Sequence, residues 1–129
     1  MVKSKVVIDT NIIIDHIRFP RKEKSPFELV IDDPNIDPLI SSTTIQELFI
    51  GQSSIKEDQE VKIRKIINSV AVIDVTAEVA ERAGQVMRAT KPQVQFADAQ
   101  IAATAILNKA KLLTLNKKDF QGIKGLKLI

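Results

Sequence analysis

The chain has 129 residues, of which 44% are hydrophobic and 27% are charged, a composition that predicts one globular domain spanning residues 1–129. It contains no cysteine, which excludes disulfides, thiolate metal sites and thiol nucleophiles and fits a reducing cytoplasm. We find neither a signal-peptide pattern nor an apolar run long enough to span a membrane, so we expect a cytoplasmic protein without membrane contact.

The net charge of +3 is unevenly distributed along the chain. Residues 109–129 contain six lysines and a single acid, and a second basic group comprises Arg18, Arg21, Lys22 and Lys24. Basic patches attract phosphate groups. Lysines that merely keep a surface soluble would give the same pattern, so charge alone leaves both interpretations open.

Short apolar runs alternate with longer stretches of helical periodicity. In chain order, the pattern predicts a strand at 5–8, helices at 11–18 and 25–32, a strand at 38–40, helices at 43–50 and 55–69, a strand at 71–73, helices at 77–90 and 96–109, and strands at 111–114 and 126–129. Strands separated by helices indicate an α/β fold whose parallel sheet is covered on both faces.

Local signals support several of these helix ends. Ser54 and Glu57 have the spacing of a capping box at the start of the 55–69 helix. Gly51 is expected to end the helix before it, and Pro92 follows the end of the 77–90 helix.

Four acidic residues fall near predicted strand ends or helix starts. Asp9 directly follows the first strand, Glu47 lies about one helical turn beyond the second, Asp98 begins the alanine-rich helix, and Asp119 follows the fourth strand. Ligands of parallel sheets bind beyond the carboxyl ends of the strands, so these acids could meet there. Mg²⁺ and Mn²⁺ prefer carboxylate ligands, and such cations support phosphodiester hydrolysis by activating water and neutralising the phosphate.

Each acid also has a purely structural interpretation. Asp9 could cap the following helix, and Thr44 with Glu47 has capping-box spacing. Asp98 could stabilise a helix dipole, and Asp119 could be a turn residue. The functional interpretation therefore depends on all four acids falling where a parallel sheet would bring them together.

Two other residue types carry weaker signals. His16, the only histidine, could be a general base, but its place on the first helix favours a packing role. The five phenylalanines are expected in the core or at an interface, because stacking on RNA would require them to be exposed in a basic groove.

Four segments, taken in order, resemble the motifs of the PIN domain family. They are Val7-Ile8-Asp9-Thr10-Asn11-Ile12, Ile40-Ser41-Ser42-Thr43-Thr44-Ile45-Gln46-Glu47-Leu48, Asp98-Ala99-Gln100-Ile101-Ala102-Ala103 and Leu113-Thr114-Leu115-Asn116-Lys117-Lys118-Asp119-Phe120. The resemblance covers nearly the whole chain and is strongest to the VapC-like toxin subfamily. It implies a three-layer α/β/α fold with a central parallel sheet of about five strands.

By position, the resemblance implies that Asp9, Glu47 and Asp98 hold one or two Mg²⁺ or Mn²⁺ ions and are catalytic, with Asp119 as a fourth catalytic acid. It implies supporting roles for Thr10, Asn11, Thr114 and Asn116. Many relatives carry an acid where this chain has Asn116, and this departure leaves occupancy of a second metal position open.

The resemblance also implies a function and partners. The chain would be a metal-dependent endoribonuclease that hydrolyses RNA, paired as a toxin with a cognate antitoxin, and it would form a homodimer. The helix at 55–69 offers apolar residues for such a dimer.

Three rival interpretations exist. A haloacid-dehalogenase-like phosphatase needs a second aspartate where this chain has Asn11, and a response-regulator receiver has an adjacent acidic pair that is missing near Ile8. A non-catalytic PIN-like scaffold or RNA-binding module is the more serious alternative. Cleavage that requires a metal would distinguish the enzyme from such a module.

Overall fold

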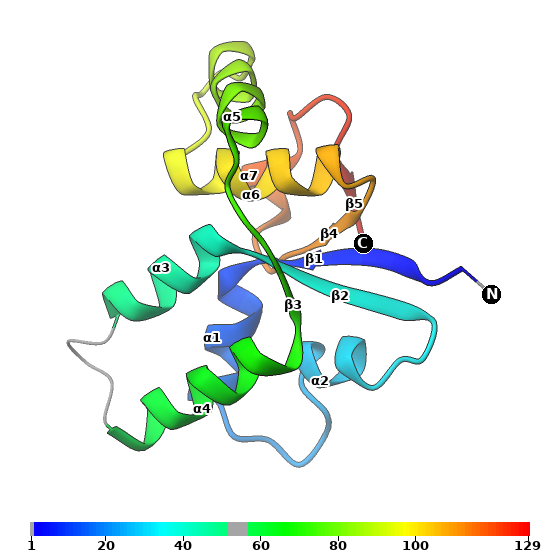
Figure 1. Cartoon of the computed structure of the whole chain (residues 1–129), viewed down its shortest axis with the longest axis vertical. Coiled ribbons are helices and arrows are strands. Elements are labelled where there is room, and N and C mark those ends of the chain that lie inside the picture. The colour runs from blue at the N-terminus through cyan, green and yellow to red at the C-terminus, as the bar shows by residue number, and fades with distance from the viewer. Residues whose placement is uncertain (1, 52–56) are drawn as a thin grey trace.

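A computed structural model describes residues 2–51 and 57–129. Its centre is a five-stranded parallel sheet with the strand order β3-β2-β1-β4-β5 (Figure 1). The strands are β1 (Ser4–Ile8), β2 (Ile36–Ser41), β3 (Ala71–Ile73), β4 (Lys111–Leu113) and β5 (Lys127–Leu128). The helices are α1 (Thr10–Arg18), α2 (Pro26–Ile31), α3 (Ser42–Ile50), α4 (Glu57–Ser69), α5 (Ala77–Ala89), α6 (Phe96–Leu107) and α7 (Lys117–Phe120).

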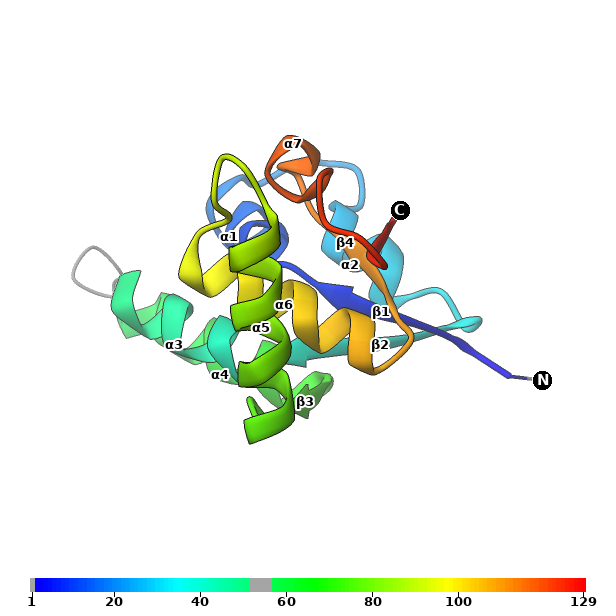
Figure 2. The same ribbon diagram turned by 90° about the horizontal axis from the view of Figure 1, so that it is seen from above.

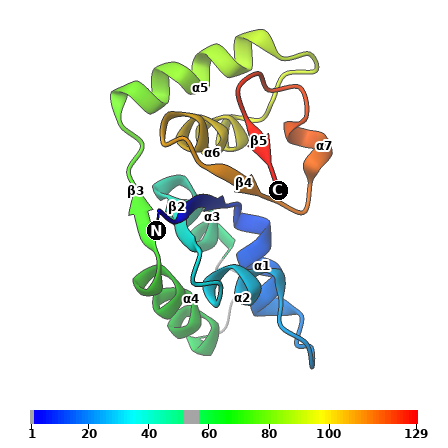
Figure 3. The same ribbon diagram turned by 90° about the vertical axis from the view of Figure 1, so that its right-hand side faces the viewer.

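Helices cover both faces of the sheet, which confirms the predicted three-layer fold. Figures 1 and 3 show α5 and α6 on one side of the strands and α1, α2 and α4 on the other. Figure 2 looks onto the α5 side, where α5 crosses over α6. The helix α3 follows β2 at its carboxyl end and contacts α1 and α6.

Alternating residues of the strands supply two separate cores, because successive side chains of a strand point to opposite faces. Val7 of β1 and Leu112 of β4 pack with α5 and α6. Ile8 and Ile40 pack with α1, α2 and α4 on the opposite face. Strands that are apolar on both faces explain why the sequence shows short continuous apolar runs.

The strand order places the candidate site at a topological switch point. From β1 the chain adds β2 and then β3 on one side, whereas β4 and β5 are added on the other side. The carboxyl ends of β1 and β4 are therefore adjacent, with Ile8 in register with Leu113. In open α/β sheets this is where ligands bind.

Several local predictions can be compared with the structure. Gly51 does end α3, although its φ of −68° is ordinary helical backbone and does not require glycine. The short helix α7 was not predicted. Ser54 lies outside the described residues, and so does the capping box predicted for it.

The expectation that the 55–69 helix has apolar residues to spare for a dimer is wrong for its central isoleucines. Ile63 and Ile66 are 0% and 7% exposed and belong to the core beneath the sheet. Across the described residues, no helix is both long and apolar enough to cross a lipid bilayer.

Candidate active site

Asp9 lies buried at the carboxyl end of β1, where it also begins α1. Its Oδ1 accepts a hydrogen bond from the Thr10 N–H at 2.8 Å, and its Oδ2 accepts one from the Thr114 hydroxyl at 2.7 Å. The helix-cap interpretation of Asp9 is thus confirmed, but the same carboxylate also links β1 to β4. Burial raises the pKa of Asp9, and the charges of Glu47 and Asp119 raise it further, against the lowering effect of its two hydrogen bonds.

Thr114 is the centre of the hydrogen bonds that fix Asp9. Besides donating to Asp9, its hydroxyl accepts from Asn11 Nδ2 at 3.2 Å and from the Asn116 N–H at 3.0 Å. Asn11 Oδ1 in turn accepts from the Leu115 N–H at 3.2 Å. The structure therefore links Asn11 to Asp9 through Thr114, while Asn116 contributes through its backbone.

Glu47 reaches the same region from α3. Its Oε1 accepts a hydrogen bond from the Thr10 hydroxyl at 2.6 Å, and that hydroxyl lies 3.0 Å from Thr44 Oγ1. The capping-box interpretation of Thr44 and Glu47 is wrong, because Ser41 caps α3 and Thr44 lies inside the helix. Thr10 consequently connects two of the predicted acids, one through its backbone and one through its side chain.

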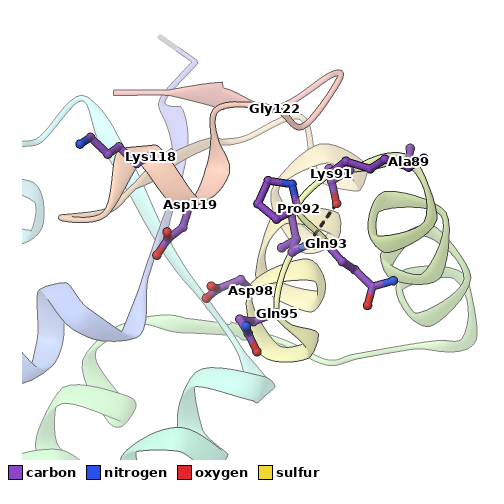
Figure 4. A pocket seen from close by; sticks show the side chains of 11 residues that line it. Ala89, Lys91, Pro92, Gln93, Gln95, Asp98, Lys118, Asp119 and Gly122 are labelled. Atoms are coloured by element: carbon purple, nitrogen blue, oxygen red, sulfur yellow. Dashed lines mark hydrogen bonds between the residues drawn. The ribbon is translucent and has the colours of Figure 1, made fainter.

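Asp98 lies in the first turn of α6, as its dipole interpretation required, and Asp119 lies on α7. Figure 4 shows the two carboxylates directed toward one another. Burial raises the pKa of Asp98 to about 6, and the charges of Asp9, Glu47 and Asp119 contribute to the rise. The charges of the other three predicted acids therefore act on Asp98 in addition to its burial.

A pocket of about 750 Å³ opens beside Asp98 and Asp119 (Figure 4). One wall is the segment between α5 and α6, and the opposite wall comes from α7 and from Gly122, two residues beyond its end. The lining residues are Ala89, Thr90, Lys91, Pro92, Gln93, Val94, Gln95, Asp98, Lys118, Asp119 and Gly122.

The donor set of these acids fits a hard divalent cation. Among the ion pairs of the described residues, none involves Asp9, Glu47, Asp98 or Asp119, so their charges are not balanced by a basic side chain. No three of the described acidic or histidine side chains are arranged to enclose a metal ion. Mg²⁺ is commonly held by one or two carboxylates, with water and substrate phosphate completing its shell, and this open arrangement suits that mode.

His16 is not brought to this site. Its Nδ1 lies 2.8 Å from Ser25 Oγ, and its ring centroid is 5.0 Å from that of Phe27. The packing role predicted for His16 is confirmed. Phe27 and Phe120 are core residues as expected, but Phe19 and Phe96 are 59% and 69% exposed.

Sequence reasoning missed the contacts that set the helices of the site against each other. The Thr43 hydroxyl donates to Gln100 Oε1 at 2.8 Å, which joins the helix of Glu47 to the helix of Asp98. Both residues lie inside the motifs that carry the resemblance. Their polar side chains were the sequence signal available for this contact. The pocket wall between α5 and α6 was also missed, because it lies between those motifs.

The comparisons with known proteins agree with this architecture. The PIN domain family model matches residues 6–126. Ribonuclease VapC1 of Methanocaldococcus jannaschii is 31% identical over 131 residues, which cover 98% of this chain and 88% of that protein. The crystal structure of VapBC2 from Rickettsia felis bound to a DNA fragment from their promoter has a TM-score of 0.81 at 27% identity, covering 97% of both chains. The toxin–antitoxin complex from Klebsiella pneumoniae has a TM-score of 0.74 at 31% identity, covering 94% of both chains.

Proposed function

This chain belongs to the PIN domain family, and we propose that it is a metal-dependent endoribonuclease acting in the cytoplasm as the toxin of a toxin–antitoxin pair. The observation that carries the proposal is the gathering of four acids at the switch point of the sheet. The 31% identity to a ribonuclease, over almost the whole chain, supports the activity.

Among the predicted metal-binding residues Asp9, Glu47 and Asp98, we propose that Asp9 and Asp98 would contact the metal most directly. Glu47 would complete its shell or position water, and Asp119 would be the fourth catalytic acid. A bound divalent cation would supply a Lewis acid that lowers the pKa of water and stabilises charge on the phosphate. The protein's own contribution is orientation. Thr114 and the Thr10 N–H hold the two oxygens of Asp9, and the Thr10 hydroxyl holds Glu47.

Asp98 has a further requirement, because its carboxylate is half-protonated near pH 6. It is mostly anionic only above that pH, or once a cation lowers its pKa. Cations that bind at this site should therefore release protons when they bind near pH 6.

The proposal is tested by incubating the purified protein with total RNA in Mn²⁺, in Mg²⁺ and in EDTA, and by mapping the cut positions. We expect defined cuts with either metal and intact RNA in EDTA. RNA that is retained by the protein but never cut would instead identify a non-catalytic RNA-binding or scaffold module. Cutting that is equally fast in EDTA would contradict the metal dependence.

We further propose a cognate antitoxin as a protein partner, supported by the toxin–antitoxin assemblies among the similar structures. An antitoxin that directs an Arg or Lys at the acids would compete with the cation for the same carboxylates. Co-expression with the product of a neighbouring small reading frame should suppress RNA cleavage. If no neighbouring product binds, the toxin role fails while the nuclease role stands.

A homodimer also remains a prediction. The buried isoleucines of α4 no longer support it, so it depends on the resemblance alone. Light scattering at tens of micromolar protein would show twice the mass of the chain if the prediction is correct.

A further inference from the structure

A second pocket continues the one beside the acids. It has a volume of about 600 Å³ and lies between α5 and the residues that follow α7. Ala89, Thr90 and Gly122 line both pockets, so the two form one groove that leads away from Asp98 and Asp119. We call it the α5 groove.

The charges along the α5 groove change with distance from the acids. Lys91 and Lys118 line the inner pocket. Figure 4 shows them on either side of Asp98 and Asp119, with the amino end of Lys118 directed away from the two acids. The outer pocket is lined by Arg82 and Lys124 and by no acidic residue.

These basic side chains are available to a ligand. Within residues 2–51 and 57–129, none of the ion pairs involves Arg82, Lys91, Lys118 or Lys124. Four cations without acidic partners, in a groove that starts at the acids, suit the phosphate backbone of a nucleic acid strand whose scissile phosphate lies at those acids.

One wall of the groove is held in place by its own hydrogen bonds. The buried Thr90 hydroxyl donates to the Val86 carbonyl at 3.1 Å and accepts from the Val94 N–H at 3.1 Å. The segment between these residues carries Gln93 and Gln95, whose exposed amides line the inner pocket. Gln95 makes no side-chain cap on α6, so its amide is free to contact a base edge.

We propose that the α5 groove binds the unpaired RNA segment adjacent to the cleaved bond, with Lys91 and Lys118 near the site and Arg82 and Lys124 farther along the strand. This assignment rests on the proposed ribonuclease function. The amides of Gln93 and Gln95 favour an unpaired strand, because the base edges of RNA are accessible to side chains mainly where the bases are unpaired. The groove also includes two lysines of the basic C-terminal region, Lys118 and Lys124. From composition alone, these lysines could not be distinguished from lysines that merely keep a surface soluble.

The test compares two double variants with the same loss of charge. Arg82→Gln/Lys124→Gln alters the outer pocket. Lys111→Gln/Lys127→Gln is the control. These two exposed lysines are register neighbours on β4 and β5, at the end of the sheet opposite to the acids. Both double variants are made in an Asp9→Asn chain so that RNA is not cut. Their binding to fluorescent unpaired RNAs of graded length is then measured by anisotropy at several salt concentrations.

We expect the outer-pocket variant to bind long RNAs about tenfold more weakly at low salt, with a salt slope reduced by roughly 1.4 for two lost phosphate contacts, and to bind the shortest RNAs unchanged. The control should match the parent chain at every length. Equal affinities and slopes for both variants would overturn the groove assignment. A changed mass in light scattering with unchanged RNA affinity would overturn it in favour of a contact between two copies of the chain.

The two proposals fail in different ways. If the wild-type chain cuts no RNA with any metal, the proposed function fails whatever the anisotropy shows. If it cuts RNA but the outer-pocket variant binds like the control, only the groove assignment fails.

Discussion

Asp98→Asn is expected to abolish RNA cleavage and yet leave the metal-free protein at least as stable as wild type at pH 8. The substitution keeps the shape of the side chain and removes a carboxylate whose pKa is raised by burial and by the nearby charges of Asp9, Glu47 and Asp119. Without a cation these charges repel, so removing one relieves the folded state. Thermal unfolding in EDTA and cleavage in Mn²⁺ measure the two effects, and added Mn²⁺ should stabilise the variant less than the wild type.

The pH dependence of stability provides the control for this prediction. The pKa of Asp98 is 3.8 in an unfolded chain and about 6 in the folded protein. Between these two pH values the folded protein therefore keeps a proton on Asp98 that the unfolded chain has lost. The free energy of unfolding should therefore fall as pH rises from about 4 to about 6, with no further loss from this group above that range. Asp98→Asn should fall less over the same interval. If Asp98 only serves the helix dipole, the variant would melt lower in EDTA and would still cut RNA, which would remove Asp98 from the site.

Thr114→Val is expected to reduce cleavage by about 10–100-fold, the usual effect of losing a residue that orients a metal ligand. Valine has the same shape but cannot donate to Asp9 Oδ2 or accept from the Asn116 N–H. Leaving buried polar groups without partners costs about 1–3 kcal/mol of stability. Denaturant unfolding and the rate of RNA cleavage in saturating Mn²⁺ measure the two losses.

Two further variants separate orientation from stability. Thr114→Ser keeps the hydroxyl and should restore most of the cleavage rate. Thr104→Val removes a buried hydroxyl that donates only to the Gln100 carbonyl within α6, so it should lower stability without a comparable loss of cleavage. Equal cleavage by the Thr114→Val and wild-type proteins would mean that Asp9 does not need this hydrogen bond.

The sheet could be predicted because its strands are apolar on both faces. Val7 and Ile8 serve opposite cores, so β1 appears in the sequence as a continuous apolar run that ends at a single acid. Because parallel strands place their carboxyl ends together, the positions of Asp9 and Asp119 after strands were enough to predict that the two acids share one edge of the sheet.

The supporting contacts of the site could not be predicted in the same way. Thr44 and Glu47 have the spacing of a capping box, but Ser41 caps the helix, which begins at Ser42, and this leaves Glu47 to accept from Thr10. Spacing within one segment does not reveal a hydrogen bond to another segment. The α5 groove could not be predicted from the sequence either, because it depends on how residues 118–124 lie against α5.

The hydrogen bond between Thr114 and Asp9 joins residues that are 105 positions apart in the chain. A ribosome makes the chain from its N-terminus, so Asp9 leaves the exit tunnel long before Thr114 is synthesised. Until β4 has been added beside β1, Asp9 lacks one of its two hydrogen-bond donors, and Asp119 is absent altogether. We therefore expect nascent chains that have not yet reached Thr114 and Asp119 to be inert towards the surrounding RNA, with the activity arising only after both residues have been added.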